Sequence, residues 1–163
     1  MRKEITQKLS EMTEDLIDPN KDTRTYCAKE VTFDYATSHS TRVDYMVFKP
    51  VNNSVSGIEK GDFYCYEIKS STEDFHSGHG HNFVGDFNYY VMSKSVYEQV
   101  KDEVPYHVGV YCPEDEKLRS VKKAIRKNRD RSCLEMLLMM FRSANRRLQK
   151  LEDLKKSCEK KIT

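Results

Sequence analysis

The stretches "RVDYMVFKP" (residues 42–50) and "FYCYEIKSS" (residues 63–71) decide the fold that this sequence predicts. Each has the composition of a β-strand, in which successive side chains point to opposite faces. Glu67 and Lys69 therefore project from the same face of the second strand. The connection between the two stretches is polar, so the simplest pairing is an antiparallel hairpin.

Further helices and strands are predicted on both sides of this hairpin. They are an amphipathic helix over 2–17, a strand within 25–38, a short helix after residue 69, a strand over 86–92, a helix between residues 95 and 105, and a strand over 106–112. Two capping boxes, Ser70 with Glu73 and Ser95 with Glu98, mark the expected starts of the two middle helices. Helical crossovers between strands favour an α/β fold with a mixed central sheet flanked by helices.

The last part of the chain is expected to be helical and basic. A heptad-like spacing predicts a helix that either packs on the domain or protrudes and pairs with a second copy as a homodimer. The apolar positions in this pattern are Leu134, Leu137, Phe141, Ala144, Leu148 and Leu151, with Cys158 in phase. We therefore expect an α/β core over 1–116 and a basic helical C-terminal extension over 117–163.

Composition and charge limit the class of protein. The 163 residues suffice for one domain, 37% of them are hydrophobic, and no apolar run approaches the roughly 20 residues that span a membrane. The five cysteines are widely spaced and odd in number, which favours reduced thiols in a cytosolic compartment. Residues 1–116 hold 12 Lys and Arg against 21 Asp and Glu (net −9), and residues 117–163 hold 16 against 5 (net +11). The basic part of the chain either neutralises the acidic part, simply keeps a helix solvated, or attracts an anionic partner such as nucleic acid.

Three charged residues on the two central strands form the candidate catalytic group: Asp44, Glu67 and Lys69. Two carboxylates on neighbouring strands can converge on a hard cation, Mg²⁺ or Mn²⁺, that also binds a phosphate oxygen. A nearby lysine can orient the attacking water or stabilise the charge that develops on the phosphate. The alternative is an ion pair on an exposed sheet face, worth about 0–1 kcal/mol.

The order helix, strand, "RVDYMVF", "YCYEIKSSTEDF" resembles the PD-(D/E)XK (restriction-endonuclease-like) nuclease superfamily, and within it the MmcB-like DNA repair proteins of phage type. Arg42, "GDFNYYVM" (85–92) and "FRSANR" (141–146) are also similar to that family. The resemblance implies a Mg²⁺-dependent phosphodiesterase acting on DNA in repair, recombination or phage nucleic-acid processing, in the cytoplasm of a bacterial cell or phage-infected host. It assigns Asp44 and Glu67 to the metal and Lys69 to catalysis. The proline that names the motif is absent, since Val43 precedes Asp44. Because members of such families can lose activity, a non-catalytic nucleic-acid-binding or adaptor protein is the alternative.

Other residues are candidates for supporting roles. Additional site residues are Glu30, Arg42, His76, Asn88 and Tyr89. The glycine-rich "HSGHGH" (76–81) suggests a loop near the active cleft more than a zinc site, because no fourth ligand is evident. The basic run over 117–131, expected as a helix, is predicted to contact the nucleic-acid backbone or to be a solvated, highly charged helix. Its basic residues are Lys117, Arg119, Lys122, Lys123, Arg126, Lys127, Arg129 and Arg131.

Overall fold

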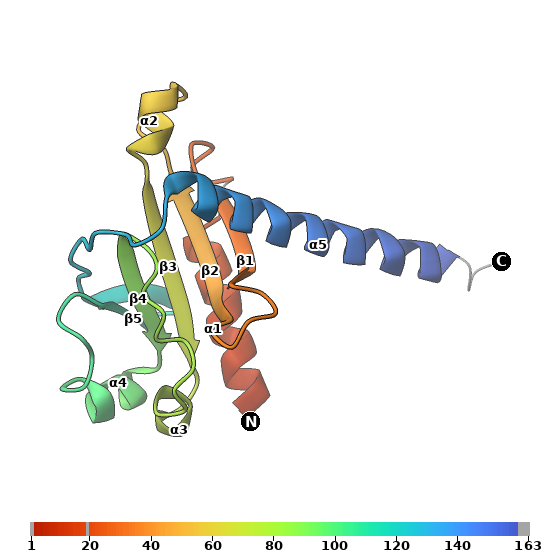
Figure 1. Cartoon of the computed structure of the whole chain (residues 1–163). Helices are drawn as coiled ribbons and strands as arrows, with labels where there is room; N and C mark the ends of the chain where they lie inside the picture. Colours follow the sequence, from red (N-terminus) through yellow and green to blue (C-terminus); the bar gives the residue numbers. More distant parts are fainter. Residues whose placement is uncertain (1, 19, 160–163) are drawn as a thin grey trace.

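The computed structural model describes residues 2–18 and 20–159 (Figure 1). Its elements are α1 (Arg2–Leu16), β1 (Tyr26–Phe33), β2 (Thr41–Lys49), α2 (Val55–Glu59), β3 (Asp62–Lys69), α3 (Thr72–Phe75), β4 (Phe87–Met92), α4 (Lys94–Val100), β5 (Gly109–Glu114), β6 (Lys117–Lys122) and α5 (Cys133–Glu159). In the part of the chain that is described, no helix is both long and apolar enough to cross a membrane.

The six strands form one sheet in the order β1-β2-β3-β4-β5-β6. β1, β2 and β3 pair antiparallel, β3, β4 and β5 pair parallel, and β6 returns antiparallel to β5. The sheet is therefore mixed, and the predicted α/β class and the β2–β3 hairpin are confirmed. The parallel steps are made through α3 and α4, as expected for crossovers that contain helices.

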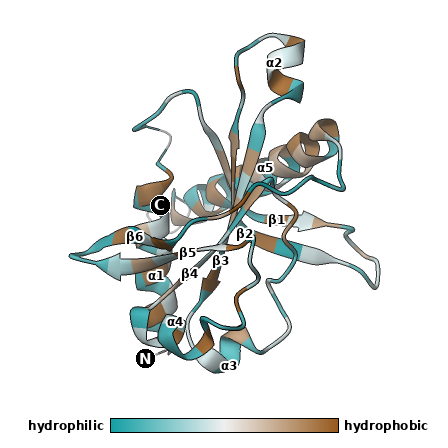
Figure 2. Ribbon diagram, turned by 90° about the vertical axis from the view of Figure 1, so that its left-hand side faces the viewer, coloured by the Kyte–Doolittle hydropathy of each residue, from teal (hydrophilic) through white to brown (hydrophobic). Residues whose placement is uncertain are grey.

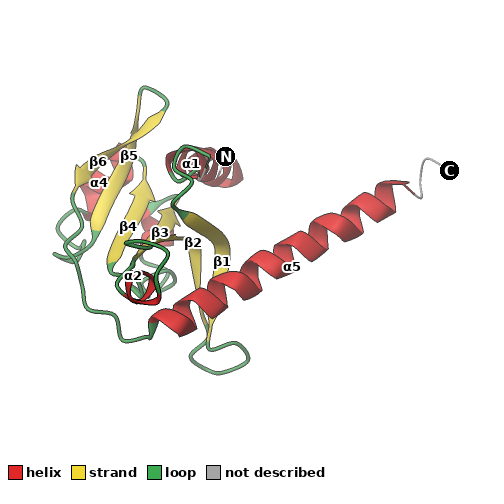
Figure 3. Cartoon of the chain, turned by 90° about the horizontal axis from the view of Figure 1, so that it is seen from above, coloured by secondary structure: helices red, strands yellow, loops and turns green. Residues whose placement is uncertain are grey.

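Helices cover both faces of this sheet (Figures 2 and 3). On one face, Met136 and Met140 of α5 pack on the apolar side of β1, β2 and β3, and α4 covers β4 and β5. On the other face, Leu9 and Met12 of α1 pack against a layer rich in tyrosine. There Tyr66 and Tyr89 stack with ring centroids 5.1 Å apart. The strand tyrosines thus serve packing, which suits their preference for half-buried sheet positions.

Two of the predicted helix caps are shifted. Ser71, not Ser70, caps α3 and accepts from the Asp74 N–H, and Ser93, not Ser95, caps α4 and accepts from the Val96 N–H. An N-cap needs an extended backbone at the capping residue, and Ser71 and Ser93 have it, with ψ angles of 170° and 155°. Helix α4 also ends at Val100, five residues before Pro105.

The predicted helix over residues 117–131 is wrong. Residues 117–122 form β6, which joins the same sheet as the core strands, and α5 begins only at Cys133. The cause is the turn before β6: Asp115 and Glu116 have φ angles of 47° and 59°. Two successive residues at positive φ make the turn that best joins antiparallel strands. The many lysines and arginines favoured a helix in the sequence analysis, although the segment forms a β-hairpin with β5.

Residues between β6 and α5 run extended along the sheet rather than as a helix. The Ile125 N–H donates to the His107 carbonyl at 2.9 Å, and the Lys127 N–H donates to the Asp86 carbonyl at 2.8 Å. Helix α5 then packs on β1 with its first half and projects beyond the sheet with its second (Figures 1 and 3). Of the expected C-terminal extension, only this helix and the segment before it lie outside the sheet.

Candidate active site

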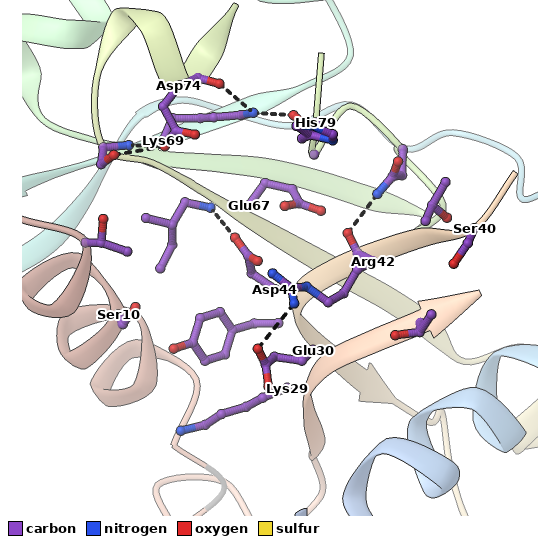
Figure 4. A pocket seen from close by; sticks show the side chains of 18 of the residues that line it. Ser10, Lys29, Glu30, Ser40, Arg42, Asp44, Glu67, Lys69, Asp74 and His79 are labelled. Carbon is purple, nitrogen blue, oxygen red and sulfur yellow. Dashed lines mark hydrogen bonds and ion pairs between the residues drawn. The ribbon is translucent and has the colours of Figure 1, made fainter. Parts of the chain in front are cut away.

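Asp44 and Glu67 lie on adjacent strands at the end of the β2–β3 ladder. Tyr45 pairs with Tyr66, so one further step along the antiparallel register sets Asp44 opposite Glu67. Here the ladder gives way to a side-chain contact, in which the Ile68 N–H donates to Asp44 Oδ2 at 2.9 Å. Figure 4 shows both carboxyl groups directed into the same cavity. The expected convergence of these two residues is therefore present.

Burial makes this carboxyl pair unusual. It raises the pKa of Glu67, and the charge of Asp44 raises it further, to about 9. Burial also raises the pKa of Asp44, against the Ile68 N–H and the charge of Arg42, which lower it. Among the described residues, Glu67 Oε1 is one of three buried side-chain polar atoms that have no hydrogen-bond partner. A buried, unpaired carboxylate oxygen is costly unless a proton or a cation compensates it.

Lys69 is almost fully buried beside Glu67, but its amine is held by backbone carbonyls. Its Nζ donates to the His79 carbonyl and to the Asp74 carbonyl, the latter at 3.4 Å. Burial lowers the pKa of Lys69, while the charges of Asp74, Glu67 and Asp44 raise it. The Lys69 amine therefore interacts electrostatically with both carboxyl groups, while it is hydrogen-bonded to one carbonyl of α3 and one of the loop that follows it (Figure 4).

The loop over residues 76–82 covers the carboxylate and the lysine. Gly80, at a φ of 70°, approaches so closely that a Cβ there would lie 2.8 Å from Glu67 Oε2 and 3.2 Å from Lys69 Nζ. Asn82 Nδ2 donates to the Arg42 carbonyl at 2.9 Å and ties the loop to β2. The glycine-rich segment therefore does lie at the site, through its backbone.

The cavity between this loop, the sheet and α1 has a volume of about 1000 Å³ and is lined by both acidic and basic side chains. Arg42 and Glu30, two of the additional candidates, lie on its wall with Arg42 Nη1 3.5 Å from Glu30 Oε1. Arg42 also lowers the pKa of both central carboxyl groups. Further lining residues from distant segments are Gln7, Ser10, Glu14, Lys29, Ser40, Asp74 and Arg147.

Three predicted residues do not line this cavity. His76 pairs with Glu103 at 2.8 Å on the exposed surface. Asn88 is buried and bonds in both directions with the backbone of Gly85. Tyr89 belongs to the tyrosine layer under α1. His81 is likewise occupied, since its ring bonds to the Tyr90 hydroxyl and the Phe75 carbonyl.

Helix α1 has three glutamates that the sequence alone does not distinguish as site residues: Glu4, Glu11 and Glu14. Glu14 is the one of the three that lines the cavity, where it accepts from the Tyr45 hydroxyl at 2.9 Å and pairs with Lys29. Gln7, Ser10 and Glu14 recur at helical spacing beside the apolar stripe that packs on the sheet. This row of polar side chains beside the apolar face was the feature of the sequence that could have indicated Glu14 as a lining residue. Arg147 had no such signal, because its position depends on where α5 crosses the sheet.

Most of the basic residues proposed as nucleic-acid contacts are engaged inside the protein. Arg129 Nε donates to the buried Asp86 at 3.0 Å, and Arg126 bonds to Asp62 at 2.7 Å. The Lys122 amine donates to the Pro105 carbonyl and the Lys127 amine to the Phe83 carbonyl, and Arg131 pairs with Asp34 and Glu135. Arg119 lies 3.8 Å from Glu114 on the surface. Lys117 and Lys123 are exposed.

These pairs explain much of the charge asymmetry. The basic segment after β6 binds Asp62 at the start of β3, Asp86 just before β4 and Asp34 just after β1, and so joins the two halves of the chain.

As to metal ligands, the described residues contain no cluster of three or more His, Cys, Asp or Glu side chains suited to an ion. Two carboxylates remain, Asp44 and Glu67. Mg²⁺ commonly takes only one or two protein carboxylates and keeps several waters. The unpaired Glu67 oxygen and the raised pKa of Glu67 fit a site for such a cation.

Comparison with known proteins gives the fold and no activity. No family model matches this chain, and no curated protein matches it. A solved structure described as the SPO1766 protein of unknown function from Silicibacter pomeroyi is similar, with a TM-score of 0.60 and 20% sequence identity. The match covers 88% of this chain and 90% of that one. The chain therefore shares its α/β architecture with that protein over nearly its whole length.

Proposed function

We propose that this protein is a divalent-metal-dependent nuclease of the PD-(D/E)XK, MmcB-like type that hydrolyses phosphodiester bonds in DNA. The observation that carries the proposal is the carboxyl pair of Asp44 and Glu67, which meets on adjacent strands in a cavity with an unpaired buried oxygen. A structural ion pair joins opposite charges, whereas here two carboxyl groups are buried side by side. Such a pair is typical of sites that bind a cation or transfer a proton.

Asp44 and Glu67 would hold Mg²⁺ or Mn²⁺ through their oxygens. When bound, the ion would supply Lewis-acid polarisation of the phosphate and a water of lowered pKa. The chain's own cations serve the substrate: Arg42 and Arg147 line the cavity and can bind phosphate oxygens. Lys69 would stabilise the developing negative charge, for which its amine must turn away from the His79 and Asp74 carbonyls.

Because the cations of the 117–131 segment are largely engaged, we assign the main phosphate contacts to the cavity wall. Arg147 and Arg42, whose contact with the exposed Glu30 spans 3.5 Å, form this set, and Lys117 and Lys123 add exposed positive charge. Contacts of this kind are independent of base sequence and weaken with salt. They suit an enzyme of DNA repair, recombination or phage nucleic-acid processing in the cytoplasm.

The decisive experiment measures Mg²⁺- or Mn²⁺-dependent cleavage of supercoiled plasmid and of labelled single-stranded, duplex and flapped oligonucleotides. Glu67→Ala and Lys69→Ala should each abolish cleavage with the fold retained. Glu103→Gln, which changes an exposed carboxylate that does not line the cavity, is the matched control and should cleave normally. Unchanged cleavage by the Glu67 and Lys69 variants would remove this mechanism.

A second candidate is a non-catalytic nucleic-acid-binding or adaptor protein on the same scaffold. The observation that favours it is the engagement of the Lys69 amine by two backbone carbonyls. This candidate predicts salt-dependent DNA binding with no cleavage under any divalent metal. The same oligonucleotide panel distinguishes the two, because it measures binding and cleavage on identical substrates.

A further inference from the structure

Strand β1 contains one residue whose backbone conformation is foreign to a strand. Glu30 has a φ of 52°, in the left-handed region, although it carries a side chain. Such a conformation costs free energy and persists only where the surrounding structure holds it. The core pattern changes at the same point, since Ala28 and Val31 both belong to the core beneath α5 and are three residues apart rather than two. Strand β1 is therefore broken at Glu30.

This break lies directly opposite Asp44. The β1–β2 register is the same on both sides of the break, but the pair that would join Glu30 to Asp44 is missing from it. The β2–β3 ladder begins only at Tyr45. Among the residues of β2, all of which the structure describes, Asp44 alone pairs with neither neighbouring strand. The place of Asp44 therefore depends on the Ile68 N–H that its carboxylate accepts and on the local shape of β1.

A side chain of α5 holds the broken part of β1. Ser143 is 5% exposed, and its hydroxyl donates to the Lys29 carbonyl and, at 3.2 Å, to the Glu30 carbonyl. Carbonyls of successive residues point to opposite sides of a regular strand, so one hydroxyl can reach both only where the strand is broken. The other two buried residues of α5, Met136 and Met140, are apolar. The polar residue that α5 buries is thus bonded to the break.

Ser143 lies in the stretch "FRSANR" (141–146), which the sequence singles out without indicating what its serine does. One helical turn further along α5, Arg147 lines the cavity together with Glu30 and Asp44 (Figure 4). The same part of α5 therefore holds the backbone of β1 and contributes a cation to the cavity.

We propose that Ser143 is a positioning residue of the candidate active site, whose hydroxyl holds the break of β1 at Glu30 and thereby keeps Asp44 in place across from it. The hydroxyl acts through the backbone and does not contact a metal or a substrate. The alternative is that Ser143 only satisfies two buried carbonyls and contributes to stability alone. The consequence for metal binding rests on the proposed function, whereas the consequence for Asp44 does not.

Nuclear magnetic resonance of the full-length, metal-free protein follows Asp44 through the Ile68 N–H. Ser143→Ala should move the Ile68 amide proton upfield, because the carboxylate shifts away from it. The same change should speed hydrogen exchange of that amide about tenfold relative to the amides of β4. The matched control is Met140→Ala, which removes a neighbouring buried side chain of α5 and leaves the hydroxyl. It should destabilise the protein at least as much and leave both readouts unchanged.

Two changes at Glu30 test whether the hydroxyl acts through the strained backbone. Glu30→Gly allows a positive φ without steric cost, whereas Glu30→Ala removes the same carboxylate and keeps the strain. Adding Ser143→Ala should speed Ile68 exchange about tenfold in the Glu30→Ala protein and less than about twofold in the Glu30→Gly protein. Should Ser143→Ala alone prevent folding, rescue by Glu30→Gly and not by Glu30→Ala gives the same answer. Equal results in the two backgrounds overturn the proposal.

Metal titration provides the link to the site. Ser143→Ala should weaken Mn²⁺ binding at least about tenfold, and Met140→Ala should not. A wild type that binds no Mn²⁺ would count against the proposed function, and the Ile68 readouts would still decide the role of Ser143. An Ile68 amide that is unchanged in Ser143→Ala, or changed equally in Met140→Ala, overturns the proposal and makes Ser143 a residue of stability alone.

Discussion

Asp44 and Glu67 face each other across the β2–β3 pair, and burial together with the charge of Asp44 raises the pKa of Glu67 to about 9. Glu67 Oε1 has no hydrogen-bond partner in the described part of the chain. Burying these two carboxyl groups together therefore costs electrostatic free energy. A proton, a bound cation or a substitution can lower this cost, and each has a measurable consequence.

The first consequence is a dependence of stability on pH. The folded protein holds the Glu67 proton up to a pKa of about 9, whereas the unfolded chain releases it near 4.5. Stability from this group is complete below about pH 4.5 and declines as pH rises towards 9. The Asp44 pKa is also raised and acts in the same direction. Without divalent metal, Glu67→Gln should raise the free energy of unfolding by several kcal/mol at pH 8 and by less than about 1 kcal/mol at pH 5. Urea denaturation at both pH values measures this, and equal effects at the two would contradict it.

The second consequence concerns metal binding. Because a cation must displace the Glu67 proton, Mn²⁺ affinity should rise about tenfold per pH unit between pH 6 and 8. Titration calorimetry in buffers of different ionisation enthalpy should show the release of about one proton per ion. Glu67→Gln should abolish both the affinity and the proton release, whereas Glu103→Gln should alter neither. Affinity that is independent of pH would mean that the ion binds elsewhere.

A third prediction follows from two glycines of the loop over the site. Gly78 and Gly80 both have positive φ, but a Cβ at Gly78 meets nothing within 4 Å while one at Gly80 meets Glu67. Each change to alanine should cost about 1–2 kcal/mol of stability through backbone strain. Gly80→Ala should in addition weaken Mn²⁺ binding at least tenfold, and Gly78→Ala should not. Chemical denaturation and metal titration of the two variants separate strain from contact.

A fourth prediction concerns the buried Asp86, which is 2% exposed. Its carboxylate accepts from the Phe63 N–H at 2.8 Å and from Arg129 at 3.0 Å. Asp86→Ala should destabilise the protein by about 3–5 kcal/mol, because it leaves a part-buried guanidinium unpaired. Arg119→Ala, which breaks an exposed pair at 3.8 Å, should change stability by less than about 0.5 kcal/mol. Similar losses in the two variants would show that the basic segment does not depend on buried pairing.

A fifth prediction tests which cations contact nucleic acid. Arg42→Ala and Arg147→Ala should each weaken DNA binding and lower the slope of log K against log salt by about one. Arg126→Ala should leave that slope unchanged, since Arg126 is already bonded to Asp62. Fluorescence anisotropy between 50 and 200 mM salt gives all three slopes. A fall in slope for Arg126→Ala alone would return the binding surface to the basic segment.

Strand alternation was sufficient to predict where Asp44, Glu67 and Lys69 would point, because the side-chain period of a strand is fixed by its backbone. The same reasoning failed for residues 117–131, where the abundance of lysine and arginine suggested a helix. There the hairpin depends on two residues at positive φ, Asp115 and Glu116. Glycine is the usual sequence signal for such a turn, and neither position is a glycine. It also depends on acidic partners far away in the chain, such as Asp86 and Asp62.

The sequence by itself determined β1 to β5, the antiparallel pairing of β2 with β3 and the shared face of the three charged residues, since these follow from periods of two and from turns between neighbours. Only the tertiary structure decided that Gly80 lies over Glu67, that the Lys69 amine is bonded to the loop, and that Glu14 and Arg147 reach the same cavity. These relations depend on how separate elements pack. Packing joins residues whose distance along the chain carries no periodic signal, and it also sets the burial that shifts the pKa of Glu67.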